Sequence, residues 1–472
     1  SLNYAAANPA CDLAASPFVV IASLRAWQSG DTPRRAGVSS LGVGGTNAHA
    51  VLEEAPARAT TGSRRTHQLL ALSAASASAL DANAVALAAH LATTPTPLAD
   101  AAYTLGTGRR ALARRRIVVA GSPGDAAAAL CDPNRTVTGE AMADRRTAFM
   151  FCGAGSQYAG MGAGLYASEP VFRAAVDAGL AEMEAIGCGE VRRCLLQDTD
   201  DEARQAMERP SIALPALFIV QVALAKLWMH WGVQPSGMIG HSSGEYAAAH
   251  LSGVIGLRDA LRVVHTRGRL FETLPQGGML SVPLAEDVLR PMLPPELSIA
   301  AINGPSLCIV SGAADAIARL HDQLAGRDIE SQRVRIAVAA HSPMLDPVLD
   351  AFRACLATVR LSAPTVPFVS NLTGLWITPE QATDPEYWVR HLRQTVRFTD
   401  GLQQLFADET QALLEVGPGR TMASLARQHP ARAKAQPVVN SLRHANEDGA
   451  DLPHMLTALG RLWTHGVTVD WD

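Results

Sequence analysis

Residues 237–244 read GMIGHSSG, and this stretch decides the fold. A short apolar strand leads into a Gly-x-Ser-x-Gly turn, after which the sequence is typical of a helix. The glycines of such a turn allow a sharp reversal that exposes the serine, Ser242, at the amino terminus of the helix. There the free N–H groups and the positive end of the helix dipole favour a developing oxyanion. The stretch therefore predicts a nucleophilic serine on a parallel α/β sheet, with an ordinary Gly/Ser loop as the plain alternative.

The sequence around this turn has the alternation of apolar strands and long helices that a parallel sheet requires. One strand is expected where this unit opens, at 149–151, and another at 413–416. Between them, residues 278–336 follow the order strand, helix, strand, strand, helix, strand, which is typical of a ferredoxin-like arrangement. We therefore expect a small ferredoxin-like subdomain inserted in a larger α/β core.

Shorter segments flank this unit. Residues 1–56 are rich in turns, and their apolar run at 18–21 predicts a strand. Residues 57–145 predict a small α+β domain behind a polar connector at 57–65, and residues 434–472 predict one helix with an apolar end. The elements expected in these last two segments are strands at 69–73 and 116–120 and helices at 75–92, 98–105 and 452–463.

Size and composition describe a globular protein of several compact units. A chain of 472 residues exceeds one ordinary core, so about two to four units are expected. Hydrophobic residues make up 48% and charged residues 18%, which excludes a disordered chain. Lys and Arg number 40 against 44 Asp and Glu, which gives a net charge of −4. A broad basic surface that would bind nucleic acid or an anionic membrane is therefore not expected. The composition favours small molecules or single proteins as partners.

Neither a membrane anchor nor a metal site is indicated. The most apolar stretch, 213–231, is interrupted by Pro215, Gln221, Lys226 and His230, so no membrane span is expected. The amino terminus lacks the order of regions that a signal peptide has. The seven cysteines are scattered without a CxxC pair, which indicates neither a zinc site nor a disulfide framework. A reducing cytoplasm fits this cysteine usage best.

A nucleophilic serine needs a base, and the chain has 14 histidines. His341 stands out because it closely follows the last strand of the inserted subdomain, although a core histidine is the plain alternative. His241 precedes the serine directly, so its side chain is expected to point into supporting structure. His49 is expected to be structural.

Two further features suit a catalytic site around this serine. The loop GAGSQ at 153–157 follows the first strand of the large unit, where α/β folds bind ligands, and its N–H groups can complete an oxyanion hole. Its plain alternative is a turn between a strand and a helix. Arg267 lies on a helix after the elbow, and a guanidinium can bind a substrate carboxylate through two parallel hydrogen bonds. Most helical arginines, however, are surface charges.

In this order and spacing, the loop, elbow, arginine and histidine resemble the acyltransferase domain of modular type I polyketide synthases. Residues 1–56, which end in GGTNAHAVLEEAP at 44–56, resemble the C-terminal end of a ketosynthase domain. Residues 57–145 resemble the ketosynthase-to-acyltransferase linker, 146–433 the acyltransferase domain and 434–472 the post-acyltransferase linker. The implied fold is an α/β-hydrolase-like core with a parallel sheet and the inserted ferredoxin-like subdomain, preceded by the α+β linker domain.

The resemblance implies roles for individual residues. Ser242 matches the acyl-accepting nucleophile and His341 its base, which a backbone carbonyl in the segment 396–398 orients; we assign this carbonyl to Arg397. Arg267 matches the arginine that grips the free carboxylate of malonyl-type substrates. The remaining matches are the oxyanion-hole N–H groups of Ser243 and Ala154 and the acyl-site residues Leu214, Asn303, Val338 and Ala340.

Some positions depart from the family pattern, and they concern the acyl pocket. A glutamine usually stands where this chain has Ala154, and another where it has Leu214. The four residues that end at the base usually read HAFH in malonyl and YASH in methylmalonyl enzymes, and here residues 338–341 read VAAH. Ala340 therefore replaces the phenylalanine that blocks C2 substituents, which predicts a malonyl-like scaffold with an opened, less polar pocket.

The implied activity is transfer of an acyl group from acyl-CoA to the phosphopantetheine thiol of an acyl carrier protein. The acyl group is malonyl-type, with 2-substituted and unusual groups included, and no metal or tightly bound cofactor is needed. The ketosynthase and other domains of the same synthase are the expected neighbours. Two alternatives stay open. One is a serine esterase or thioester hydrolase, for which we find no acidic third triad member. The other is a non-catalytic scaffold module, which the altered loop at Ala154 suggests.

Overall fold

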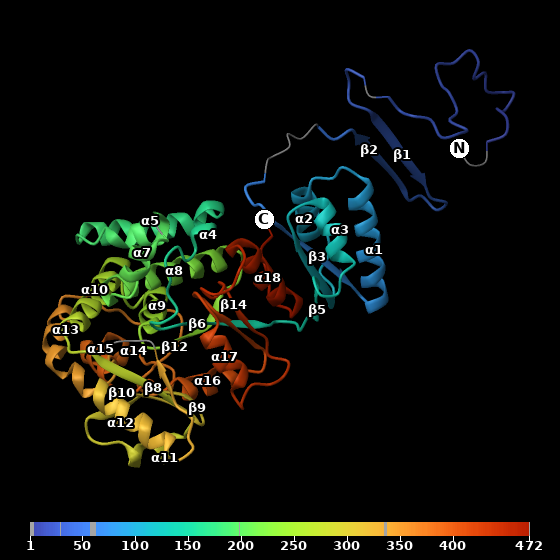
Figure 1. Cartoon of the computed structure of the whole chain (residues 1–472). Coiled ribbons are helices and arrows are strands. Elements are labelled where there is room, and N and C mark those ends of the chain that lie inside the picture. Colours follow the sequence, from blue (N-terminus) through green and yellow to red (C-terminus); the bar gives the residue numbers. More distant parts are fainter. Residues whose placement is uncertain (1–3, 29, 57–62, 198, 335–337, 472) are drawn as a thin grey trace. The chain divides into compact units, whose positions relative to one another are not determined.

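A parallel sheet is the centre of the larger unit of this computed structural model, which describes residues 4–28, 30–56, 63–197, 199–334 and 338–471 (Figure 1). Within these ranges its strands follow the order β12-β7-β6-β13-β14, and every neighbouring pair is parallel. The inner strands β6 and β13 are almost fully buried, which explains their near-continuous apolar sequences. The bounds are β6 Arg146–Phe151, β7 Pro235–Gly240, β12 Phe368–Val369, β13 Gln411–Glu415 and β14 Val438–Asn440.

Helices pack around this sheet. The longest, α8 (Pro210–His230), is apolar and long enough to cross a membrane, but 89% of its apolar window is buried inside the protein. It packs between α5 and α10 and is therefore a core helix. The other helical elements of this region are α4 Ala163–Ser168, α5 Pro170–Ala185, α6 Glu190–Arg192, the π-helix Arg193–Gln197, α7 Asp201–Ala206, α9 Gly244–Leu251, α10 Leu257–Glu272, the 3-10 helix Pro343–Val348, α13 Leu349–Leu356, α14 Pro379–Thr383, α15 Pro385–Arg393, α16 Phe398–Phe406 and α17 Thr421–Gln428.

The inserted subdomain has its own antiparallel sheet, drawn in yellow in Figure 1. Its strand order is β11-β8-β10-β9 with antiparallel neighbours, which is the order that the ferredoxin-like arrangement requires. Leu280, Val310 and Leu320 belong to a separate hydrophobic core under this sheet. The predicted ferredoxin-like insertion is thus confirmed. Its elements are β8 Gly277–Val282, α11 Glu286–Leu289, the 3-10 helix Arg290–Met292, β9 Leu297–Gly304, β10 Leu307–Ala313, α12 Ala314–Ala325 and β11 Gln332–Val334.

The α+β linker domain and the C-terminal helix also form as predicted. The antiparallel sheet β3-β4-β5 packs against α1 and α3 through a small core of its own. The helix α18 packs on β4 so closely that a Cβ at Gly460 would lie 2.6 Å from the Ile117 side chain. The bounds are β3 Gln68–Ala74, α1 Ala77–Thr93, α2 Leu98–Thr107, β4 Arg114–Ala120, α3 Pro123–Leu130, β5 Val137–Glu140 and α18 Asp451–Thr464.

The residue contacts divide the chain into two units, Ser1–Ser63 and Arg64–Asp472. The first unit contains the antiparallel hairpin of β1 (Arg35–Leu41) and β2 (Asn47–Glu53). The strand predicted at 18–21 is wrong: the structure has no strand at these described residues, and Phe18, Val19 and Ile21 are exposed. Most of the connector predicted at 57–65 lies outside the described residues. The domain boundaries predicted from the sequence, after 56, 145 and 433, stay predictions.

Candidate active site

Ser242 lies in a sharp turn between β7 and α9, at the carboxyl end of a central strand. Its φ angle is 51°, a left-handed conformation that residues other than glycine seldom adopt. Both glycines of the motif are needed for close approach. A Cβ at Gly240 would lie 2.1 Å from the Glu245 nitrogen, and one at Gly244 would lie 2.2 Å from the Phe151 carbonyl oxygen. The turn therefore has the elbow geometry that the motif predicts.

The hydroxyl of Ser242 forms a hydrogen bond with His341. Ser242 Oγ lies 2.7 Å from His341 Nε2, and His341 Nδ1 lies 2.8 Å from the carbonyl oxygen of Gln394. A carbonyl oxygen only accepts, so Nδ1 must carry the ring proton and Nε2 must accept from the serine O–H. The imidazole is therefore the tautomer that can remove the serine proton.

The carbonyl that orients His341 belongs to Gln394, and the prediction that Arg397 supplies it is wrong. The Arg397 carbonyl accepts from the Gly401 nitrogen at 3.1 Å, because Arg397 begins the first turn of α16. Gln394 instead follows the last residue of α15 in an extended conformation, which leaves its carbonyl outside the helical hydrogen-bond pattern. That carbonyl is consequently available to the imidazole.

The surroundings of His341 keep its ring neutral. The residue is 3% exposed, and this burial lowers its pKa well below the ordinary value of 6.5. The positive charge of Arg267 lowers the pKa further, while the hydrogen bond to the Gln394 carbonyl opposes the shift. A neutral imidazole at physiological pH is what a base for the serine requires.

Arg267, on α10, brings a buried positive charge to the serine. Its side chain is 2% exposed, and its Nη2 donates to Ser242 Oγ at 2.9 Å. The guanidinium carbon lies over the rings of Tyr246 and Phe271, 5.7 and 5.3 Å from their centroids. Within the described chain, its Nε and Nη1 have no hydrogen-bond partner, and burial lowers the guanidinium pKa. Since a buried, unpaired cation is costly, this arrangement suits an anionic ligand.

Two backbone N–H groups beside the serine have no acceptor among the described residues, those of Ser243 and Ala154. Ser243 is the N-cap of α9, and Ala154 lies in the loop after β6. This loop packs against the elbow, since a Cβ at Gly153 would lie 2.8 Å from the His241 carbonyl oxygen and 3.5 Å from Ser242 Cβ. They are the two donors that the sequence predicts for an oxyanion hole, and that role stays a prediction.

The other predicted acyl-site residues have different surroundings. Asn303 Oδ1 accepts from His241 Nε2 at 2.8 Å, so His241 points into supporting structure as expected. Leu214 lies on α8 and is buried in the main core. Val338 and Ala340 are half-buried in the segment that follows β11. Contact of these side chains with an acyl group stays a prediction.

Sequence reasoning missed the residues that hold the elbow in place. Asn371 is 2% exposed; its Oδ1 accepts from the Ser242 nitrogen and its Nδ2 donates to the Gly240 carbonyl, both at 2.7 Å. The fully buried Glu245 carboxylate accepts from the Asn371 nitrogen at 2.7 Å and from the Tyr387 hydroxyl. His391, also buried, lies 3.5 Å from the same carboxylate.

The position of Asn371 carried only a weak signal in the sequence. It follows β12, whose parallel neighbour is β7, so both strands end at the edge that carries Ser242. A residue at that edge is a candidate for a site. However, β12 is only two residues long, which is too short for a recognisable strand pattern.

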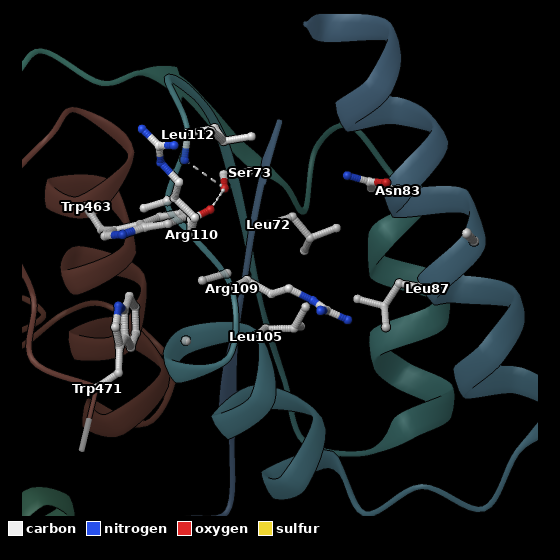
Figure 2. A pocket seen from close by; sticks show the side chains of 14 residues that line it. Leu72, Ser73, Asn83, Leu87, Leu105, Arg109, Arg110, Leu112, Trp463 and Trp471 are labelled. Carbon is white, nitrogen blue, oxygen red and sulfur yellow. Dashed lines mark hydrogen bonds between the residues drawn. The ribbon is translucent and has the colours of Figure 1, made fainter. Parts of the chain in front are cut away.

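A pocket of about 350 Å³ lies elsewhere in this unit and shares no residue with the site around Ser242 (Figure 2). It lies in the linker domain, and Trp463 and Trp471 form one of its sides. The hydroxyl of Ser73 in its wall is engaged, because it donates to the Arg110 carbonyl at 3.2 Å and accepts from the Leu112 nitrogen at 3.0 Å. No His, Asp or Glu is among its lining residues, so the pocket holds no base for this hydroxyl. No cluster of His, Cys, Asp and Glu that could hold a metal occurs among the described residues.

The sequence pattern of the acyl transferase domain family matches residues 148–469, and that of the CurL-like C-terminal region of polyketide synthases matches residues 68–130. A phenolphthiocerol/phthiocerol polyketide synthase of Mycobacterium tuberculosis is 39% identical over 494 aligned residues, which cover 100% of this chain and 33% of that protein. Polyketide synthase GfsB of Streptomyces halstedii is 35% identical, over 98% of this chain and 9% of its own length. The chain thus spans a third or less of the length of these relatives.

Solved structures with the same fold are also acyl transferase domains. That of ZmaA superimposes with a TM-score of 0.82 at 37% identity, covering 87% of this chain and 97% of the other. That of SpnD, in complex with 2-(pent-4-yn-1-yl)malonyl, superimposes with a TM-score of 0.78 at 39% identity, covering 86% and 98%.

Proposed function

The chain belongs to the acyl transferase domain family of polyketide synthases, and from that premise we propose which group it transfers and to what. It is an acyltransferase that takes a malonyl-type acyl group from acyl-CoA and delivers it to the phosphopantetheine thiol of an acyl carrier protein. The group so chosen becomes a building block of a polyketide. The reaction takes place in the cytoplasm, beside the ketosynthase and other domains of the same synthase.

The first half-reaction loads Ser242. His341 Nε2 takes the hydroxyl proton while Ser242 Oγ attacks the thioester carbonyl, and a C–O bond forms. The carbonyl oxygen becomes an oxyanion, which the N–H groups of Ser243 and Ala154 stabilise. The tetrahedral intermediate then loses the CoA sulfur, which takes the proton from His341. An acyl-serine ester and free CoA remain.

The second half-reaction unloads Ser242. His341 removes the proton of the phosphopantetheine thiol, and the sulfur attacks the ester carbonyl. A C–S bond forms, the C–O bond to Ser242 breaks, and the proton returns to the serine oxygen. His341 carries out every proton transfer and backbone N–H groups stabilise the oxyanion, so the scheme needs no metal or tightly bound cofactor.

One observation carries this proposal: Arg267, Ser242, His341 and Gln394 form an unbroken line of hydrogen bonds, at 2.9, 2.7 and 2.8 Å. The buried guanidinium at one end supports a donor with a free carboxylate, because Nε and Nη1 have no partner in the described residues. The backbone carbonyl at the other end replaces the carboxylate of a Ser-His-Asp triad. A hydrolase of that kind is therefore not favoured.

The acyl pocket is proposed to accept groups larger than malonyl. Ala340 stands where a phenylalanine would fill the space beside C2, and Ala154 and Leu214 replace two polar amides. The related SpnD domain, of 39% identity, was solved with a malonyl group that has a five-carbon 2-substituent. A pocket without the phenylalanine is consistent with such a substituent here.

Transfer and hydrolysis can be separated by isolating the acyl-enzyme and adding a carrier protein. We expect radiolabelled acyl groups to move to a carrier that bears phosphopantetheine and to stay on the enzyme with the same carrier lacking it. Release of free acid at equal rates with both carriers would identify a hydrolase. An enzyme that no acyl-CoA loads would identify a scaffold module.

A further inference from the structure

Asn371 joins the two halves of the catalytic pair. Its side-chain amide bridges the elbow, since Oδ1 accepts from the Ser242 nitrogen and Nδ2 donates to the Gly240 carbonyl, both at 2.7 Å. Its backbone carbonyl accepts from the Arg397 nitrogen at 2.8 Å. One residue therefore bonds both to the turn that carries the nucleophile and to the segment that orients the base.

The elbow needs such a bridge because its conformation is unfavourable. Ser242 has a φ angle of 51°, and a residue with a Cβ keeps that conformation only where its surroundings hold it. The planar amide of Asn371 bonds to the backbone on either side of His241. Rotation of Ser242 into an ordinary conformation would break at least the bond from its N–H to Asn371 Oδ1, in a buried site where lost hydrogen bonds are costly.

The base depends on the same residue through a short segment. Gln394, whose carbonyl orients His341, lies three positions before Arg397. Between them, the Val396 nitrogen donates to the Ala300 carbonyl at 2.9 Å. The segment is thus fixed by the small subdomain at Val396 and by Asn371 at Arg397. A shift of Asn371 would displace the nucleophile and the orienting carbonyl together.

Buried groups in turn fix Asn371. The Glu245 carboxylate accepts from the Asn371 nitrogen at 2.7 Å, and the Tyr387 hydroxyl lies within hydrogen-bond distance of that carboxylate and, at 2.8 Å, of Ser370 Oγ. Glu245 is fully buried and Asn371 is 2% exposed. Glu245 cannot take another rotamer without losing these bonds, and Asn371 cannot do so without losing its side-chain bonds to the Ser242 nitrogen and the Gly240 carbonyl.

We infer that Asn371 is a positioning residue that sets the geometry between Ser242 and His341, with Glu245 and Tyr387 as its supports. It acts through these two catalytic residues and touches no substrate. Its effect on acyl transfer rests on the proposed function, whereas its effect on the reactivity of Ser242 does not.

The test is Asn371→Asp, which keeps the shape and removes the donor to Gly240. We expect kcat for self-acylation by malonyl-CoA to fall by about 100-fold, as a misplaced reacting group does, with KM unchanged because Arg267 is intact. The rate at which a sulfonyl fluoride modifies Ser242 should fall by a similar factor. The ratio of variant to parent rates should rise as the pH falls, since a protonated Asp can again donate to the Gly240 carbonyl.

Asn440→Asp is the matched control. The Asn440 amide also donates to a backbone carbonyl, that of Leu442 at 3.1 Å, but it takes no part in the site. We expect parental rates from this variant. Tyr387→Phe, which removes one donor to Glu245, should lower kcat by a smaller factor with KM unchanged, and it decides the matter if Asn371→Asp does not fold.

Parental kcat and parental sulfonyl fluoride rates in a folded Asn371→Asp would overturn the inference. So would a raised KM with unchanged kcat, or, where that variant does not fold, a parental kcat in Tyr387→Phe. If no acyl-CoA loads the parent, the proposed function fails, and the sulfonyl fluoride rates of parent and variants still decide the role of Asn371.

Discussion

The two walls of the active site are built differently. On the wall that belongs to the central core, the buried side chains of Arg267 and Asn371 are hydrogen-bonded to the half-buried Ser242. On the wall that we propose for the acyl group, in the segment after β11, Val338 and Ala340 have small, half-buried apolar side chains. Apolar side chains without hydrogen bonds can change size at modest cost, whereas a buried hydrogen-bond network cannot lose a member cheaply. The core wall should therefore govern whether the reaction occurs, and the other wall which acyl group is used.

The largest effect is expected from Ser242→Ala on the core wall. Without Oγ no ester can form, so self-acylation should be lost while the thermal midpoint stays near that of the parent. Intact-mass measurement after incubation with acyl-CoA, together with a melting curve, checks both. Covalent loading that persists in a folded variant would contradict the role of this serine.

Arg267→Ala should discriminate between substrates. Loss of a charge-assisted pair with a desolvated carboxylate costs about 2–4 kcal/mol, so kcat/KM for malonyl-CoA should fall by about 30- to 1,000-fold more than kcat/KM for acetyl-CoA. Arg269→Ala, on the exposed side of the same helix, is the control and should change neither value. Equal losses for both substrates in Arg267→Ala would assign a structural role to this arginine.

Ala340→Phe tests the other wall. Each buried methylene contributes about 0.8 kcal/mol, so a 2-substituent of a few carbons gains about 1.5–3 kcal/mol if the space beside C2 is open. When malonyl-, ethylmalonyl- and butylmalonyl-CoA compete in one reaction, the parent should load the substituted groups. The Ala340→Phe variant should prefer malonyl. A parent that loads only malonyl, with no change in the variant, would mean that neighbouring side chains fill the space.

The smallest effect concerns Glu415, which ends β13 and lies outside the site. Burial raises its pKa from 4.5 to about 7, although its carboxylate accepts from the Met422 and Ala423 nitrogens. Because the folded state binds this proton more tightly than the unfolded state, its contribution to stability is present at low pH and is lost as the pH rises through 7. Between pH 5 and 8 the parent should lose about 2–3 kcal/mol of stability relative to Glu415→Gln, which cannot titrate.

Thermal or denaturant unfolding of both proteins across this pH range measures that difference. The glutamine variant has its own pH-independent loss of stability, since its amide replaces one of the two accepting oxygens with an NH2 group. Only the change of stability with pH is therefore informative. Parallel pH profiles would show that Glu415 does not titrate between these pH values.

The sequence could predict the elbow and not its supports, for a physical reason. Gly240, Ser242 and Gly244 stand within five positions of one another, so their spacing alone identifies the turn, although Gly244 packs against the distant Phe151. Asn371 and Glu245 bond to each other across 126 positions, and no local pattern reports that contact. The base was found because it follows a recognisable subdomain.

The two errors have the same kind of cause. The orienting carbonyl was placed at Arg397 and belongs to Gln394, because which carbonyl is left free depends on where α15 ends and α16 begins, and helix ends are poorly determined by sequence. The run at 18–21 is as apolar as a strand, but apolar sequence alone does not make a strand, and here Phe18, Val19 and Ile21 stay exposed instead of packing in a core.

The most direct test of the account is the mass of the intact protein after incubation with a panel of acyl-CoAs, followed by digestion to locate the modified residue. The account predicts the added mass of a malonyl-type acyl group on Ser242, removed when a carrier protein with phosphopantetheine is added. An added mass on another residue, or no added mass with any malonyl-type donor, would contradict it.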